Sequence, residues 1–198
     1  MWPFQKKPKE EAKKKRAYYL AAKEDTKERE IEIMASKVRW AIQQSPNKEL
    51  VFLCIGSDRS TGDALGPFVG SMLKQNKLPY PVYGTLKSPV HALNLGEVMK
   101  ELKENYENPM IFAIDACLGD EERIGYILFK EEPLIPGHAL NKSLPQVGQL
   151  HMRAIVNYLD PLSPAQSLND TRLYTVIHLA GVITDIIMRA TSTEEFEE

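Results

Sequence analysis

The sequence predicts a three-layer α/β/α sandwich with a mostly parallel central sheet and an additional N-terminal helix. Two continuous apolar runs, at 50–55 and 110–114, have the composition of strands that are buried on both faces. Segments with apolar residues at helical spacing follow these runs, and the order strand, helix, strand, helix, strand is typical of crossover units in a parallel sheet. At 198 residues the chain has the usual size of one domain.

Residues 1–46 are predicted to form a basic helical arm. Residues 1–50 carry 13 Lys and Arg against 8 Asp and Glu, whereas residues 51–198 carry 12 against 19. The Lys, Glu and Ala content favours helix up to residue 30, and Ile31, Met34, Val38 and Ile42 continue it with an apolar stripe that ends before Pro46. This stripe should dock on the body, and the positive charge suits either an acidic partner or the acidic body itself.

Residues 47–191 are predicted to form the α/β domain. After the strand at 50–55, a polar loop leads to a helix at 65–73, and then follow a strand at 82–86, a helix at 95–106 and the strand at 110–114. A short alternating run at 126–129 predicts a strand near an edge of the sheet. Apolar residues at helical spacing predict two more helices, at 152–159 and 173–187, and a further strand is considered at 161–170. Residues 192–198 form an acidic tail.

Composition excludes several classes of protein. No run of 18 apolar residues is present, and the N-terminus lacks the apolar segment of a secretory signal. Two cysteines are too few for a disulfide scaffold, and the net charge of −2 does not predict nucleic-acid binding. We therefore expect a cytoplasmic protein that contacts neither a membrane nor nucleic acid directly. Association into a homo-oligomer is left open.

Two acidic loops follow the two apolar runs. The first is GSDRSTGDALGP, from Gly56 to Pro67, and the second is FAIDACLGD, from Phe112 to Asp120. Ligands of open α/β sheets bind outside the carboxyl ends of the strands, at a switch in strand order. If the two strands are neighbours, Asp63 and Asp115 meet there, and two close carboxylates do not both ionise easily. Such a pair can supply a general acid and a general base, although each aspartate could equally cap a helix or a loop.

Other residues of these loops are weaker candidates for binding or support. Asp58 suits a turn or a third acid at the site. Arg59 suits a pairing with these acids, a contact to a substrate carboxylate, or a solvent-facing position in the loop. Gly62 directly precedes Asp63. Cys117 follows Asp115 by two residues, but no cysteine-protease pattern surrounds it. The loop glycines lack dinucleotide-binding or P-loop spacing. No cluster has zinc-ligand spacing, so we predict neither metal nor cofactor.

The segments GDALGP and AIDACLG resemble the spore germination protease family, in which each corresponding segment supplies one catalytic aspartate. The sequence is most similar to the smaller YyaC-type sporulation proteins of that group, over residues 50–190. The resemblance implies that Asp63 and Asp115 are catalytic in an endopeptidase of sporulating cells or spores. It also implies that small acid-soluble spore proteins are the substrates. We expect Asp115 to accept a proton from water and protonated Asp63 to polarise the peptide carbonyl, although the roles could be reversed.

Two alternatives to this function remain. The chain could be a non-catalytic sporulation protein that keeps the fold and binds a peptide or protein partner. The same fold group also contains the nickel-linked hydrogenase maturation endopeptidases, whose later loop carries a metal-binding histidine after a proline. Gln146 occupies that place here and is a poor nickel ligand, which disfavours this alternative, although His151 lies nearby.

Overall fold

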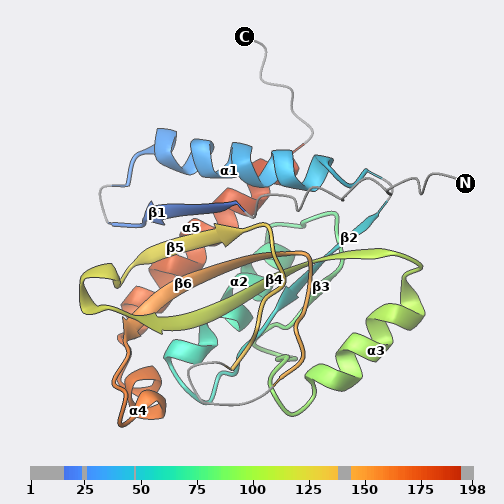
Figure 1. Ribbon diagram of the computed structural model, residues 1–198. Helices are drawn as coiled ribbons and strands as arrows, with labels where there is room; N and C mark the ends of the chain where they lie inside the picture. Colours follow the sequence, from blue (N-terminus) through green and yellow to red (C-terminus); the bar gives the residue numbers. More distant parts are fainter. Residues whose placement is uncertain (1–15, 24–25, 47, 138–143, 193–198) are drawn as a thin grey trace, which may run out of the picture.

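The computed structural model describes residues 16–23, 26–46, 48–137 and 144–192 (Figure 1). Its strands are β1 (Ala17–Ala21), β2 (Glu49–Cys54), β3 (Val82–Tyr83), β4 (Pro109–Gly119), β5 (Tyr126–Lys130) and β6 (Leu150–Tyr158). Its α-helices are α1 (Glu28–Gln43), α2 (Leu65–Gln75), α3 (Leu95–Asn105), α4 (Pro164–Asn169) and α5 (Leu173–Thr191). Residues 1–15 of the predicted basic arm and 193–198 of the predicted acidic tail lie outside the described residues.

The strands form one mostly parallel sheet in the order β1-β5-β6-β4-β2-β3. Strands β2, β3, β4 and β6 are parallel, and only β5 runs the opposite way, because it pairs antiparallel with both β6 and β1. The chain passes from β2 outward to β3 and then returns to the other side of β2 to form β4. The strand order therefore reverses between β2 and β4, which is where ligands bind in sheets of this kind.

Helices cover both faces of the sheet, which confirms the predicted α/β sandwich. On one face, α1, α2 and α5 pack on alternate strand residues such as Phe52, Phe112 and Met152. On the other face, α3 and the segment around Leu134 and Val147 pack on the intervening strand residues. In Figure 1, α2 and α5 pass behind the strands while α3 lies in front of them. These two layers of buried apolar area are the main stabilising contribution to the fold.

Three predicted elements were wrong. Residues 150–158 form β6 in the middle of the sheet instead of a helix, and residues 164–169 form helix α4 instead of a strand. Residues 17–21, which we expected to be helical, form β1 at the end of the sheet. Strand β5 is consequently not at the edge, since β1 covers it. Helix α1, by contrast, forms where predicted and buries Ile31, Met34 and Val38 in the main core.

Helix α5 is long and apolar enough to cross a membrane by length and composition alone. Its residues Val176, Leu179, Ile183 and Ile187 are buried in the core against α1 and α2. Arg39 on α1 also donates to the carbonyl oxygen of Arg189 on α5 at 2.6 Å, which ties the two helices together. Helix α5 is therefore a core helix of the α/β fold.

Candidate active site

The first acidic loop is closed on itself, and this closure places Asp63 over the end of β2. The Ser57 N–H donates to the carbonyl oxygen of Asp63 at 3.1 Å, and the Gly56 N–H donates to that of Val90 at 2.8 Å. Gly56 has φ +145°, and a Cβ there would lie 2.0 Å from the Asp63 oxygen, so only glycine permits this closure. Asp63 lies in the 3₁₀ turn Gly62–Ala64 that leads into α2, with its side chain half-buried.

The second aspartate lies within β4 rather than after it. Residues Ile111, Ala113 and Asp115 alternate onto the face of the sheet that α3 shares, and Asp115 is the first residue beyond the part of β4 that pairs with β2. The residue is 8% exposed. Asp115 pairs in register with Arg153 on β6, so the two side chains stand next to each other on the same face.

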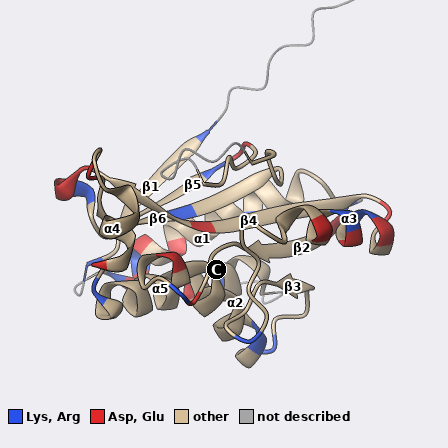
Figure 2. Cartoon of the chain, turned by 90° about the horizontal axis from the view of Figure 1, so that it is seen from below, with Lys and Arg blue, Asp and Glu red and all other residues tan. Residues whose placement is uncertain are grey.

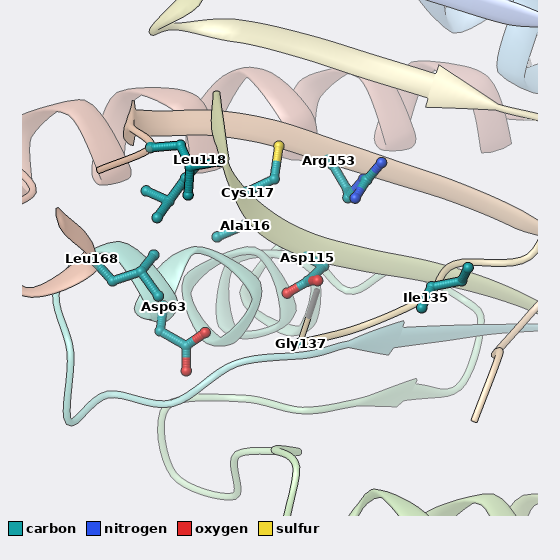
Figure 3. A pocket seen from close by; sticks show the side chains of 10 residues that line it. Asp63, Asp115, Ala116, Cys117, Leu118, Ile135, Gly137, Arg153 and Leu168 are labelled. Carbon is teal, nitrogen blue, oxygen red and sulfur yellow. The ribbon is translucent and has the colours of Figure 1, made fainter. Parts of the chain in front are cut away.

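Two cavities meet at the aspartates. The first, which we call the Arg153 cavity, has a volume of about 110 Å³ and is lined mainly by apolar side chains together with Arg153. The second, the His91 cavity, has a volume of about 210 Å³ and includes His91 and Arg59. Asp63, Asp115 and Gly137 line both cavities. In Figure 3, Asp115 lies between Asp63 and Arg153, with Gly137 beside it. A chain that passed from one cavity to the other would cross both carboxyl groups.

The surroundings of Asp115 favour its protonated form. Burial is the largest influence and the negative charge of Asp63 the next, and together they raise the pKa of Asp115 to about 8. The positive charge of Arg153 and a hydrogen bond from the backbone of Ala116 oppose this rise. A pKa of about 8 keeps Asp115 mainly protonated near neutral pH.

The same pKa shift predicts how stability depends on pH. The folded protein keeps the Asp115 proton up to about pH 8, whereas the unfolded chain releases it near pH 4, so the contribution of Asp115 to stability is lost as pH rises through this window. Asp115→Asn is neutral at every pH. We expect this variant to exceed the wild type in free energy of unfolding at pH 9 and to approach it at pH 4. Urea unfolding at both pH values measures the difference, and an equal difference at the two values would contradict the assignment.

Cys117 lines the Arg153 cavity but is not placed as a nucleophile. Its thiol donates to the carbonyl oxygen of Ala154 at 3.4 Å. Burial, the largest influence, raises the pKa of the thiol to about 11. Because the thiolate is the reactive form, a thiol with this pKa is inert near neutral pH. Its position supports a packing role beside Asp115.

The remaining predicted residues of the first loop have different positions. Gly62 is buried, and a Cβ there would lie 2.9 Å from the carbonyl oxygen of Leu168 in α4. Arg59 is exposed but lines the His91 cavity together with both aspartates. Asp58 is exposed in the turn and lines neither of the two cavities. Of these residues, Gly62 therefore positions Asp63, and Arg59 is the one that a ligand in the His91 cavity would meet.

Arg153 is a site residue that the sequence did not indicate, because its segment was predicted to be a helix. Asp115 and Arg153 are the only Asp, Glu, Lys or Arg residues within β4 and β6, both of which the structure describes in full. Figure 2 shows the charged residues gathered mainly on helices and loops. The Arg153 Nε is buried and has no hydrogen-bond partner within the described residues. A lone arginine in an apolar run is the signal that could have identified it.

The structure does not assemble the ligand set of a nickel site from the residues it describes. No three His, Cys, Asp or Glu side chains of this part of the chain are grouped to hold a metal ion. His151 is buried, and its Nδ1–H donates to the carbonyl oxygen of Glu132 at 2.8 Å. Gln146 is exposed and lines neither the Arg153 cavity nor the His91 cavity. Neither residue joins the aspartates.

Comparison with known proteins gives two matches. Residues 21–186 match the model of a family described as protein of unknown function (DUF1256). The chain is also 40% identical over 159 residues to the protein named "Uncharacterized protein YyaC" of Bacillus subtilis (strain 168). That alignment covers 80% of this chain and 77% of the relative. The family match contains both aspartate segments, and it begins at Ala21, the last residue of β1.

Proposed function

The chain belongs to the DUF1256 family, and from the geometry of its own site we propose that it is an endopeptidase in which Asp63 and Asp115 act as a catalytic pair. The observation that carries the proposal is that two carboxyl groups from neighbouring strand ends line the same two cavities at the switch in strand order. One of them is buried beside an arginine, and the other is half-buried. Their different environments suit one proton shared by an acid and a base.

The environments of the two aspartates reverse the assignment that we expected first. Asp115 is the better acid catalyst, because burial and the charge of Asp63 keep it protonated. Asp63, as the carboxylate, accepts a proton from a water molecule whose oxygen attacks the peptide carbonyl carbon. The Asp115 carboxyl group hydrogen-bonds the carbonyl oxygen and then gives its proton to the leaving amine as the C–N bond breaks. After the products leave, the proton on Asp63 passes to the Asp115 carboxylate, which restores the starting state of the pair.

Arg153 supports this division of roles through its charge. It stands beside Asp115 in register and lines the same cavity, where it stabilises the negative charge that develops on the carbonyl oxygen. It also limits the rise in the Asp115 pKa. Without Arg153, the pair would hold its proton to higher pH but would stabilise the transition state less.

This role of Arg153 predicts a change in the pH dependence of activity. Wild-type activity should fall as pH rises through about 8, since Asp115 then loses the proton that it must donate. Arg153→Met should lower kcat and move this alkaline limb to higher pH, because the charge that lowers the Asp115 pKa is gone. A pH profile of kcat for the two proteins measures both effects. An unchanged alkaline limb in the variant would show that Arg153 does not act on Asp115.

The resemblance of GDALGP and AIDACLG to the spore germination protease supports small acid-soluble spore proteins as the substrates and the cytoplasm of the sporulating cell or spore as the site of action. Incubation of the purified protein with a small acid-soluble spore protein, beside Asp115→Ala, tests the proposal. We expect discrete fragments by mass spectrometry from the wild type only. Absence of fragments from both would instead favour a non-catalytic protein that binds a peptide or protein partner at this site.

A further inference from the structure

The outer edge of β1 is free of a sheet partner within the described residues. At its two ends, β1 is bonded to the β5 side through the backbone. The carbonyl oxygen of Arg16 accepts a hydrogen bond from the N–H of Glu131, and the N–H of Ala22 donates to the carbonyl oxygen of Gly125. In an antiparallel pair, every second residue of a strand bonds its N–H and C=O groups to the neighbouring strand. The even-numbered residues of β1 therefore bond β5, and the N–H and C=O groups of Ala17 and Tyr19 point away from it. Such an edge is a template for pairing with another strand.

A groove runs along this free edge, between β1 and the flank of α1, which lies beside β1 in Figure 1. It has a volume of about 440 Å³. Its middle is apolar, with Tyr19 on the strand 57% exposed and Ile33 on the helix 51% exposed. Its helical side begins at Glu30 and ends at Lys37, both exposed, so the groove is acidic at one end and basic at the other.

We propose that a second copy of this chain docks on this edge, through a two-fold axis that passes by Tyr19. Such an axis pairs β1 with β1 of the second copy in antiparallel orientation and extends the sheet continuously through both copies. Tyr19 then lies opposite Tyr19 of the second copy, and their outward N–H and C=O groups bond each other. The two α1 helices lie antiparallel on the same face of the joined sheet.

The charges of α1 support a second copy rather than an unrelated chain as the occupant. Residues 30 and 37 lie symmetrically about the middle of the groove, at Ile33 and Met34. The two-fold rotation therefore sets Glu30 of one copy opposite Lys37 of the other, twice, while the exposed Ile33 side chains meet at the centre. A surface whose acidic and basic ends exchange under two-fold rotation is complementary to itself.

This inference does not rest on the proposed peptidase function. Strand β1 is separated from β4 by β5 and β6, and neither the Arg153 cavity nor the His91 cavity includes a residue of β1 or α1. Dimerisation through β1 therefore leaves both cavities open.

Charge reversal at the two ends of the groove tests the proposal by sedimentation velocity on the full chain. We expect the wild type to sediment as a dimer of its 22.5 kDa chains. In Lys37→Glu alone or Glu30→Lys alone, each dimer would hold two like-charge contacts, and the dissociation constant should rise on the order of 10-fold to 100-fold. An equimolar mixture of the two variants should form a mixed dimer as tight as the wild type, because both contacts are again between opposite charges.

The mixture also separates a lost interface from a lost fold. Glu30 accepts a hydrogen bond from the Lys27 N–H at 3.2 Å, so Glu30→Lys also weakens the start of α1, but that effect would not be rescued by mixing. Lys100→Glu on α3, where the lysine is 79% exposed, is the matched control and should leave the dimer unchanged. A wild type that sediments as a monomer would overturn the proposal, and this would also be the result if another segment of the same chain covered the edge of β1. Single variants that stay as dimeric as the wild type would overturn it too.

Discussion

Replacing either Asp63 or Asp115 with asparagine is expected to lower kcat for peptide hydrolysis by roughly 10²–10⁴-fold. Asparagine keeps the shape of each side chain but neither accepts the water proton nor donates to the leaving amine. Both residues line the same two cavities, so each variant leaves the substrate path unaltered and removes one member of the pair. Initial rates on a spore-protein substrate, with fold checked by circular dichroism, measure the loss.

The double variant distinguishes a catalytic unit from two independent contributors. If both aspartates act in one transition state, Asp63→Asn combined with Asp115→Asn should lose little more activity than either single variant. Asp58→Asn is the matched control, since Asp58 is an exposed aspartate of the same loop that lines neither cavity, and it should retain near wild-type activity. Losses that multiply in the double variant would indicate that the two aspartates act separately.

Gly66→Ala is expected to be strongly destabilising. Gly66 lies in the first turn of α2, and a Cβ there would be 2.1 Å from the carbonyl oxygen of Ile55. The obstacle is backbone of the segment that follows β2, so relief requires α2 to move away from the sheet. Because overpacking against side chains already costs about 1–3 kcal/mol, we expect this variant to lose about 3 kcal/mol or more. Urea unfolding at neutral pH measures the loss.

Gly181→Ala is the control for this substitution. Gly181 is an exposed glycine within α5, and a Cβ there meets nothing within 4 Å. Alanine favours helix over glycine by about 0.5–1 kcal/mol, so this variant should be slightly more stable than the wild type. If Gly66→Ala proved as stable as Gly181→Ala, the claim that α2 lies this close to the backbone of Ile55 would be contradicted. The same close approach holds Asp63 over the sheet.

The strands and helices that were predicted correctly have residue patterns that fit only a strand or only a helix. A continuous apolar run ended by Gly56 indicates a buried strand, and the large apolar residues of α2 recur at helical spacing with small residues between them. Strand β6 was missed because it is largely buried on both faces, so its apolar residues do not alternate strictly and Met152, Ile155 and Val156 also fit helical spacing. Strand β1 was missed because AYYLA is short and follows a stretch rich in Lys and Glu.

Each residue of the candidate site could be predicted only where the strand that carries it was predicted. Asp63 follows β2 and Asp115 lies within β4, both strands were predicted, and the parallel pairing of β2 and β4 brings the two aspartates to one place. Arg153 depends on β6, because only a strand beside β4 sets it in register with Asp115. The role of each aspartate depends on burial and on neighbouring charge, which the order of residues does not reveal.

Hydrolysis in ¹⁸O-labelled water tests most directly whether the two aspartates cleave peptide bonds by activating water. The purified protein is incubated with a small acid-soluble spore protein in labelled water at neutral pH, and the fragments are analysed by mass spectrometry beside those from the Asp63→Asn, Asp115→Asn double variant. We predict that the wild type produces fragments whose new carboxyl termini carry ¹⁸O, and that the double variant produces none. Intact substrate in the wild-type reaction, or the same labelled fragments from the double variant, would contradict the account.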